Sequence, residues 1–287
     1  MSKSTFDIYT DAIREFISVP GIAARMVMHD EKLPPMEQVR YGPHKRNHLI
    51  VYEAASGVKA RKEIIYFIHG GGWRMGSPHR RRLLVKLFTD MGYIVMMPTY
   101  RLAPTVSFPE IHEDAFRGFK EAQHHPFAEG RKFILMGESA GGSLGAFLAY
   151  DKKAQEQSGI DVSSILGLIS VVGVLDMEPM PDTFVVRDYA GERDSDLFKK
   201  SNPISLLTSD VHIPVLAIHG DDDGLVPHAS AENFIKAINR LNTGLGEFHL
   251  VANGTHMGVA TDWYLEDNYT RKVILNWIMQ LSMNDEQ

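Results

Sequence analysis

Short runs of apolar residues alternate with longer amphipathic stretches along this 287-residue chain. The most apolar runs are continuous, which is typical of strands that are covered on both faces of a parallel sheet. Strands are expected near residues 37–42, 47–54, 64–68, 93–97, 133–136, 165–169, 215–218 and 248–251. Helical spacing predicts helices near residues 78–91, 110–124, 140–156, 228–241 and 262–281. This order predicts an α/β fold with a mostly parallel central sheet of about eight strands and helices on both faces.

Two segments fall outside this alternation. Residues 4–18 place apolar side chains at helical spacing, which predicts an amphipathic N-terminal helix. Residues 174–208 lie between two core strands and are too long for a simple turn. We interpret this insertion as a small lid whose methionines offer a pliable apolar surface, with an irregular structural connection as the alternative. Because no internal repeat or low-complexity linker interrupts the chain, residues 1–287 are expected to form one domain.

One turn carries the strongest chemical signal. Its sequence is Gly137-Glu138-Ser139-Ala140-Gly141, between a predicted strand and a predicted helix. In such a nucleophile elbow, a serine stands at the apex of a strained turn, and side chains in place of the two glycines would collide with neighbouring turns. The string alone is a weak signal in a chain with 24 glycines, but its place between strand and helix strengthens it. Ser139 is therefore the candidate nucleophile.

A serine hydroxyl becomes an effective nucleophile when an oriented base removes its proton. After a nucleophile elbow, the acid and then the histidine follow along the chain. Asp221, Asp222 and Asp223 directly follow the strand predicted at 215–218, and we choose Asp223 because it lies in the tight turn that leaves the strand, with Asp222 as its main rival. His256 lies on a glycine-bounded loop after the last strand. Its ordinary pKa of ~6.5 suits proton transfer at neutral pH.

A glycine-rich loop, His-Gly-Gly-Gly-Trp at residues 69–73, follows another buried strand. Cleavage of an ester or amide creates a negatively charged oxygen, which main-chain N–H groups stabilise when they point at it. Glycines let the backbone come close enough to do so. We therefore predict an oxyanion hole formed by the N–H groups of Gly71, Gly72 and Ala140.

Composition and charge restrict the kinds of molecule that this chain is expected to bind. The net charge is −6 and the pI is about 6.1, so no strong basic field attracts nucleic acid or an anionic membrane. The basic run Arg80-Arg81-Arg82 is interpreted as a solvated helix start. The absence of cysteine excludes disulfides and thiolate metal sites, and neither a metal-binding helix nor a dinucleotide motif is found. We therefore expect no cofactor and no metal.

The chain starts without the uninterrupted apolar run of a signal peptide, and no segment approaches the ~20 apolar residues that cross a bilayer. We therefore expect a cytoplasmic protein without stable membrane association. An exposed edge strand in the predicted sheet would allow a homodimer.

Together these motifs resemble those of the α/β-hydrolase superfamily and, within it, the hormone-sensitive-lipase-like carboxylesterases. The matching stretches are His69–Trp73, Pro98–Pro104, Phe108–Pro109, Asp114, Gly137–Gly142, Asp223 and His256. The resemblance implies an α/β-hydrolase fold with a small lid, and it implies that Ser139, Asp223 and His256 form a catalytic triad beside the oxyanion hole named above.

The resemblance also implies that Tyr100, Arg101 and Asp114 support the site structurally. Two positions depart from the family pattern, which commonly has Asp where Glu138 stands and Pro where Gly224 stands. These differences leave the triad intact, but they leave the subfamily and the substrate open.

The resulting hypothesis is a serine hydrolase that cleaves small-molecule carboxylic esters of small to medium acyl chains through an acyl-enzyme intermediate. An aryl-formamidase similar to the kynurenine formamidases would use the same machinery and is the alternative. A non-catalytic small-molecule binding protein on the same fold is a third hypothesis. Such a protein need not keep a general base, so retention of Ser139, Asp223 and His256 argues against it.

Overall fold

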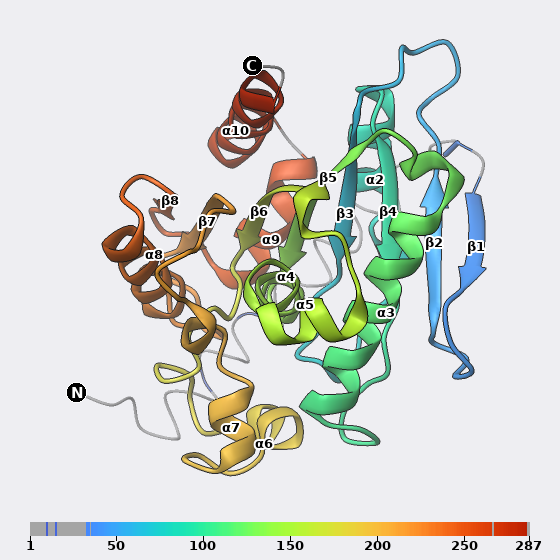
Figure 1. Ribbon diagram of the computed structural model, residues 1–287. Coiled ribbons are helices and arrows are strands. Elements are labelled where there is room, and N and C mark those ends of the chain that lie inside the picture. Colours follow the sequence, from blue (N-terminus) through green and yellow to red (C-terminus); the bar gives the residue numbers. More distant parts are fainter. Residues whose placement is uncertain (1–9, 11–14, 16–32, 35, 266, 286–287) are drawn as a thin grey trace.

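The computed structural model describes residues 10, 15, 33–34, 36–265 and 267–285 (Figure 1). Of the helix predicted at residues 4–18, only Thr10 and Glu15 belong to this part of the chain, and both are helical. The rest of that prediction lies outside the described residues. Within them, no helix combines the length and the apolar character that a membrane span requires.

The described residues contain one eight-stranded sheet with the strand order β1-β2-β4-β3-β5-β6-β7-β8. Its strands are β1 (Met36–Arg40), β2 (His48–Tyr52), β3 (Glu63–Ile68), β4 (Ile94–Pro98), β5 (Lys132–Glu138), β6 (Ile165–Val171), β7 (Val215–Gly220) and β8 (Gly246–Val251). Strand β2 is antiparallel to β1 and β4, whereas all other neighbours are parallel. The predicted mostly parallel sheet is thereby confirmed.

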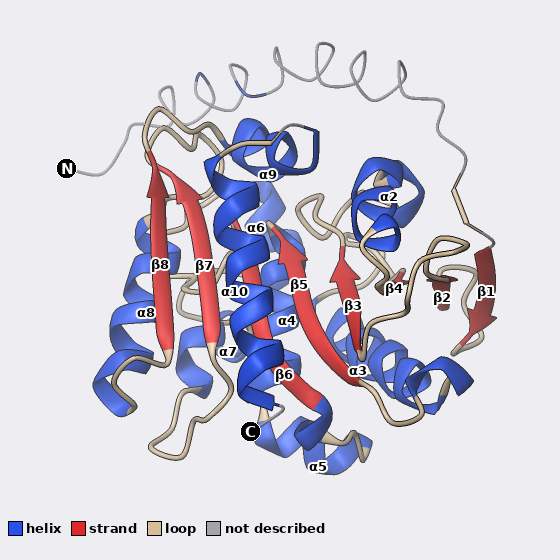
Figure 2. Cartoon of the chain, turned by 90° about the horizontal axis from the view of Figure 1, so that it is seen from above, coloured by secondary structure: helices blue, strands red, loops and turns tan. Residues whose placement is uncertain are grey.

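Helices cover both faces of this sheet, as predicted (Figure 2). The α-helices after residue 36 are α2 (Arg82–Asp90), α3 (Phe108–His124), α4 (Ala140–Tyr150), α5 (Lys152–Ser158), α6 (Phe184–Ala190), α7 (Asp196–Lys200), α8 (Ala229–Leu241), α9 (His256–Leu265) and α10 (Tyr269–Asp285). Successive side chains of a strand point to opposite faces. Accordingly, Ile64, Tyr66 and Ile68 of β3 share a core with α3, α4 and α8, whereas Ile65 and Phe67 share one with α2, α9 and α10.

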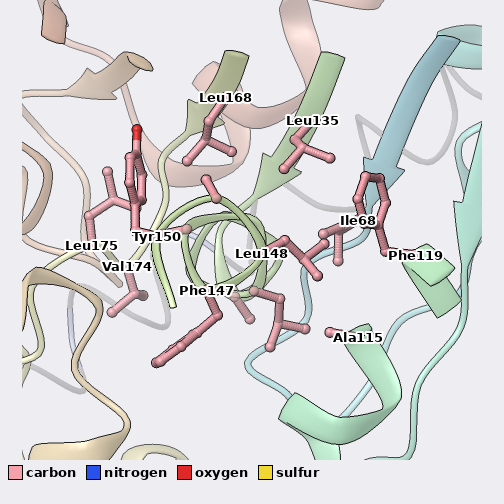
Figure 3. Packing of buried hydrophobic residues seen from close by; sticks show 14 of the residues in the cluster. Ile68, Ala115, Phe119, Leu135, Phe147, Leu148, Tyr150, Leu168, Val174 and Leu175 are labelled. Atoms are coloured by element: carbon pink, nitrogen blue, oxygen red, sulfur yellow. The ribbon is translucent and has the colours of Figure 1, made fainter. Parts of the chain in front are cut away.

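Helix α4, which begins directly after Ser139, is buried along its whole length. Figure 3 shows Phe147 and Leu148 of this helix in the same apolar cluster as Leu135 of β5 and Leu168 of β6. Removing one such buried side chain typically costs about 2–5 kcal/mol. This packing holds the first turn of α4, and therefore the serine before it, in a fixed place on the sheet.

Two of the predicted helices are each divided into two α-helices in the structure. The helix predicted at 140–156 ends at Tyr150, and α5 then begins after Asp151, whose Oδ1 accepts the N–H of the third residue beyond it at 3.0 Å. The helix predicted at 262–281 corresponds to parts of α9 and α10, and Asn268 Oδ1 accepts a main-chain N–H at the start of α10 at 2.9 Å. In both places a capping side chain starts a new helix within a stretch of apolar periodicity.

The insertion at 174–208 contains α6, α7 and a 3₁₀ helix (Pro203–Leu206). In Figure 1, α6 and α7 lie beyond the carboxyl ends of β3 and β5. Met177 and Met180 are buried, and both belong to the core shared with α4. The methionines therefore fill the interior rather than form the pliable surface that the sequence indicated, because the segment folds back onto α4.

Candidate active site

Ser139 stands between β5 and α4 with backbone angles φ 52° and ψ −121°. A positive φ is costly for a residue with a side chain and persists where the surroundings impose it. A Cβ atom on Gly137 would lie 2.3 Å from the carbonyl oxygen of Gly141, and one on Gly141 would lie 2.1 Å from the carbonyl oxygen of Ile68. Glycine is therefore required at both positions, and the serine side chain is held at the apex of the turn.

The three predicted triad residues meet beyond the carboxyl ends of parallel strands. Nε2 of His256 lies 3.0 Å from Oγ of Ser139, and Nδ1 of His256 lies 2.7 Å from Oδ2 of Asp223. Asp223, rather than Asp222, is thus the carboxylate that contacts the imidazole. When Nδ1–H donates to Asp223, the unprotonated Nε2 faces the serine hydroxyl and can accept its proton.

Fixed partners surround the Asp223 carboxylate. Oδ1 accepts the main-chain N–H groups of Leu225 at 2.9 Å and Val226 at 2.8 Å, while Oδ2 contacts His256 and lies 3.1 Å from Nε2 of His219. Burial by itself would raise the pKa of Asp223, but His256 and His219 outweigh burial and hold the pKa of this carboxyl well below its usual range. The carboxylate is therefore ionised at neutral pH and orients the imidazole.

His256 lies at the first position of helix α9, not on a loop as the sequence indicated. Thr255 precedes it, and its Oγ1 accepts a main-chain N–H of the first turn at 3.1 Å, so the helix starts one residue after this cap. Burial lowers the pKa of His256, but the negative charges of Asp223, Glu15 and Glu138 outweigh burial and raise the pKa above its ordinary value. These charges favour the imidazolium that forms when the base takes up a proton.

The glycine-rich loop at 69–73 packs directly against the elbow. A Cβ atom on Gly70 would lie 2.7 Å from the carbonyl oxygen of Glu138 and 3.0 Å from Cβ of Ser139. Any side chain at Gly70 would therefore push the loop away from the serine. This close approach places the glycine-rich loop directly against the turn that carries Ser139.

The predicted oxyanion donors belong to the two segments that meet in this way. Gly71 and Gly72 have φ values of 123° and 59°, which favour glycine. Among the described residues, the main-chain N–H groups of Gly71 and Gly72 have no hydrogen-bond acceptor. Ala140 is the first residue of α4, where N–H groups lack intrahelical partners and the helix dipole favours negative charge. These groups are available to a negatively charged oxygen beside Ser139.

Two pairs of residues support the loop at 69–73 and the chain after β4. The hydroxyl of Tyr100 donates to the carbonyl oxygen of His69 at 2.8 Å, and the two rings stack with their centroids 4.4 Å apart. Arg101 contacts the buried Asp114 through Nε at 2.9 Å and Nη2 at 2.8 Å. Burial lowers the pKa of His69 to about 3, so its imidazole is neutral and takes a structural place in the loop.

The interpretation of Arg80–Arg82 as a solvated run is wrong for Arg81. Its guanidinium contacts the carboxylate of Glu138 twice, through Nε at 2.9 Å and Nη2 at 2.5 Å, and both side chains are largely buried. Burial by itself would lower the pKa of Arg81, but Glu138 outweighs it and raises the pKa above the usual range. The residue at 138, where the family commonly has Asp, therefore forms a bidentate ion pair directly before Ser139.

Two residues that contact Asp223 or His256 were not predicted from the sequence. His219 contacts the carboxylate of Asp223. Its position at the end of β7, just before the three aspartates, is a signal from which this contact could have been predicted. Glu15 contacts the main chain at His256 and at Gly224. No motif or spacing in the sequence indicated that contact.

A sequence profile described as alpha/beta hydrolase fold matches residues 65–207. Isoprenylcysteine alpha-carbonyl methylesterase of Arabidopsis thaliana is 24% identical over 247 residues, which cover 79% of this chain and 56% of that protein. Esterase LipC of Mycobacterium tuberculosis is 25% identical over 287 residues, which cover 88% of this chain and 70% of that protein. The matched region thus spans little more than half of the plant relative.

Solved structures of esterases share the fold. Esterase B from Lactobacillus rhamnosis, inhibited by a tributyrin phosphonate, has a TM-score of 0.76 at 21% identity, and the match covers 100% of this chain and 98% of that one. The butyrate-bound esterase Est2 of Thermogutta terrifontis has a TM-score of 0.66 at 21% identity and covers 86% and 95% of the two chains. By its sheet topology, its sequence profile and these likenesses, the chain has the α/β-hydrolase fold, and it resembles the hormone-sensitive-lipase-like carboxylesterases.

Proposed function

We propose that this protein is a serine hydrolase that cleaves carboxylic esters through an acyl-enzyme intermediate. The observation that carries the proposal is the relay from Asp223 through His256 to Ser139, with contacts of 2.7 and 3.0 Å. The esterases among the relatives of this family support the same reaction. Both distances are those expected when a nucleophile is hydrogen-bonded to its base and the base is hydrogen-bonded to the group that orients it.

The proposed reaction has two halves. Ser139 Oγ attacks the ester carbonyl carbon while His256 Nε2 takes the hydroxyl proton, and the carbonyl π-electrons move to oxygen. When the tetrahedral intermediate collapses, the bond to the alkoxy oxygen breaks and His256 returns the proton to the departing alcohol. Water then attacks the acyl-serine in the same way, so the acid leaves and Ser139 is regenerated.

The oxyanion of each intermediate is proposed to accept the N–H groups of Gly71, Gly72 and Ala140. The close packing of Gly70 against Ser139, the place of Ala140 directly after Ser139 and the lack of an acceptor for Gly71 and Gly72 among the described residues support this role. In known hydrolases, each such donor contributes about 3–4 kcal/mol to the transition state.

A preference for small to medium acyl chains is supported by helix α6, which lies over the oxyanion loop. Cγ1 of Val185 lies 3.0 Å from the place where a Cβ atom of Gly72 would be. The rings of Trp73 and Tyr189 stack with a centroid separation of 3.9 Å. Long acyl groups next to these residues would have to displace α6. The short-chain inhibitor and product in the two esterase structures fit the same preference.

A chain-length series of p-nitrophenyl esters, from acetate to palmitate, tests the proposal. We expect the highest kcat/KM between acetate and hexanoate, and we expect Ser139→Ala to lose both turnover and labelling by a fluorophosphonate. Ser209→Ala is the matched control, because Ser209 is exposed and should leave turnover unchanged. Undiminished turnover by Ser139→Ala would refute the assigned nucleophile.

The same preparation separates the other two hypotheses. Faster turnover of N-formylkynurenine than of any short ester would identify a formamidase that uses the same triad. Tight binding of a small molecule without turnover on the whole ester panel would instead point to a binding protein.

A further inference from the structure

Glu15 is a buried carboxylate that reaches the catalytic loops from the beginning of the chain. Its side chain is 1% exposed. Oε1 accepts the main-chain N–H groups of His256 at 2.8 Å and Gly224 at 3.0 Å, and Oε2 accepts that of Met257 at 3.2 Å. One carboxylate therefore contacts two loops that leave different strands, β7 and β8.

The two contacted loops are those that carry the acid and the base of the relay. Gly224 directly follows Asp223, so its N–H fixes the peptide beside the acid. His256 is contacted at its own main-chain nitrogen. The separation between the Asp223 carboxylate and the His256 imidazole is set by the backbones of these loops, and Glu15 holds both backbones through a single oxygen atom, Oε1.

The contact also has a favourable electrostatic setting. The N–H groups of His256 and Met257 belong to the first turn of α9, where the helix lacks its own acceptors and the helix dipole favours a negative charge. A buried carboxylate is costly to desolvate unless several donors satisfy it, and the three N–H groups provide such donors. The Glu15 carboxylate oxygens therefore have hydrogen-bond donors in their buried position next to the relay.

We propose that Glu15 is a positioning residue that fixes the loop of Asp223 and the loop of His256 relative to each other. The proposal rests on the hydrolase function proposed above and adds a residue that the family motifs do not contain. Because Glu15 accepts main-chain N–H groups of Gly224, His256 and Met257, it acts through the loops that carry Asp223 and His256.

Glu15 has a second, electrostatic consequence for the base. Three carboxylates act on His256 electrostatically, namely those of Asp223, Glu15 and Glu138. Asp223 also contacts His219, and Glu138 pairs with Arg81. Burial lowers the pKa of His256, and among the groups that oppose burial the negative charge of Glu15 follows that of Asp223. Replacing Glu15 by a neutral side chain therefore lowers the pKa of His256.

The test compares Glu15→Gln and Glu15→Ala with the unchanged protein, each normalised by fluorophosphonate titration of reactive sites. Glu156→Gln is the control, because Glu156 is exposed on α5 and its substitution removes the same charge. We expect kcat per titrated site to fall about 10- to 100-fold in Glu15→Gln, the range that a small misplacement of catalytic groups produces. We expect KM to change less than about threefold, because ground-state binding is untouched.

The pH profile separates positioning from mere structural support. We expect the acidic limb of kcat/KM to move to lower pH in Glu15→Gln and to stay in place in Glu156→Gln. A smaller number of fluorophosphonate-reactive sites, with unchanged kcat per site and an unchanged acidic limb, would overturn the proposal, because Glu15 would then serve folding alone. So would kcat per site within about twofold of the unchanged protein.

A spectroscopic measurement tests the positioning role of Glu15 independently of the proposed ester hydrolysis. His256 Nδ1 and Asp223 Oδ2 are 2.7 Å apart, so we expect the proton between them to give a low-field resonance in proton NMR spectra recorded without substrate. We expect this resonance to shift or broaden in Glu15→Gln and to persist in Glu156→Gln. Absence of ester turnover with this spectral change would reject the proposed function but keep the positioning role. An unchanged resonance would reject the positioning role.

Discussion

The Oδ2 atom of Asp223 and the Nδ1 atom of His256 are 2.7 Å apart, whereas the adjacent Asp222 is exposed at the surface. This relationship predicts different outcomes for two neighbouring substitutions. Asp223→Asn places an amide against Nδ1 and favours the wrong tautomer, so we expect kcat/KM to fall by about 10,000-fold. Asp222→Asn should stay within about twofold of the unchanged protein. Steady-state kinetics with p-nitrophenyl butyrate measures both, and a larger loss in Asp222→Asn would contradict the assignment.

The raised pKa of His256 predicts an acidic limit to activity. Burial lowers this pKa, but Asp223, Glu15 and Glu138 outweigh burial. Since the neutral imidazole is the base, activity is lost as the pH falls through the raised pKa. We expect the acidic midpoint of kcat/KM above ~6.5, the ordinary value for histidine. A pH series at constant ionic strength measures it, and a midpoint below that value would contradict the electrostatic picture of the site.

Two glycines with positive φ provide a matched test of the oxyanion loop. Gly71 has φ 123°, and a Cβ atom there would lie 2.3 Å from the carbonyl oxygen of Met75, so Gly71→Ala must displace the loop. We expect kcat to fall about 100-fold, as for loss of one oxyanion donor. Gly130 has φ 66° with nothing within 4 Å of such an atom, so Gly130→Ala should cost about 1 kcal/mol of stability and leave kcat unchanged. Equal kcat values in the two variants would argue against the predicted hole.

The ion pair between Arg81 and Glu138 predicts a stability effect. Arg81→Leu leaves the Glu138 carboxylate buried without its partner, so we expect the free energy of unfolding to fall by about 3 kcal/mol. Arg81→Leu combined with Glu138→Gln should recover part of this loss, because no uncompensated charge is left. Urea unfolding measures both variants, with Arg80→Leu at the exposed neighbour as the control. The same stability in Arg80→Leu and Arg81→Leu would refute the structural role of the pair.

The sheet and most helices could be predicted because their signals are local. The continuous apolar run at 64–68 and its counterparts indicate buried strands, and the structure places strands within a few residues of every predicted range. The divisions at Asp151 and Asn268 were missed, since a single capping side chain ends a helix without interrupting the apolar periodicity.

The residues of the elbow and of the triad could also be chosen from the sequence, because chain order and the ends of strands confine them. Asp223 could not be separated from Asp222 with certainty, since adjacent residues in a turn point in directions that only the folded backbone defines. Arg81 and Glu15 could not be identified at all. Their partners are distant in sequence, and charged side chains at such positions are usually solvated. Whether the chain forms a homodimer stays a prediction.

The hydrogen bond from the main-chain N–H of His256 to Glu15 closes a loop of 241 residues within this 287-residue chain. A chain that leaves the ribosome from its N-terminus therefore makes this glutamate long before its partners exist. Contacts between residues so far apart in sequence form slowly, although the entropic cost of closing the loop grows only slowly with its length, so we expect this one to form late in folding. After dilution from denaturant, we expect helical content to return before ester turnover, because the contact between Glu15 and the main chain of His256 needs the loop after β8 to be in place.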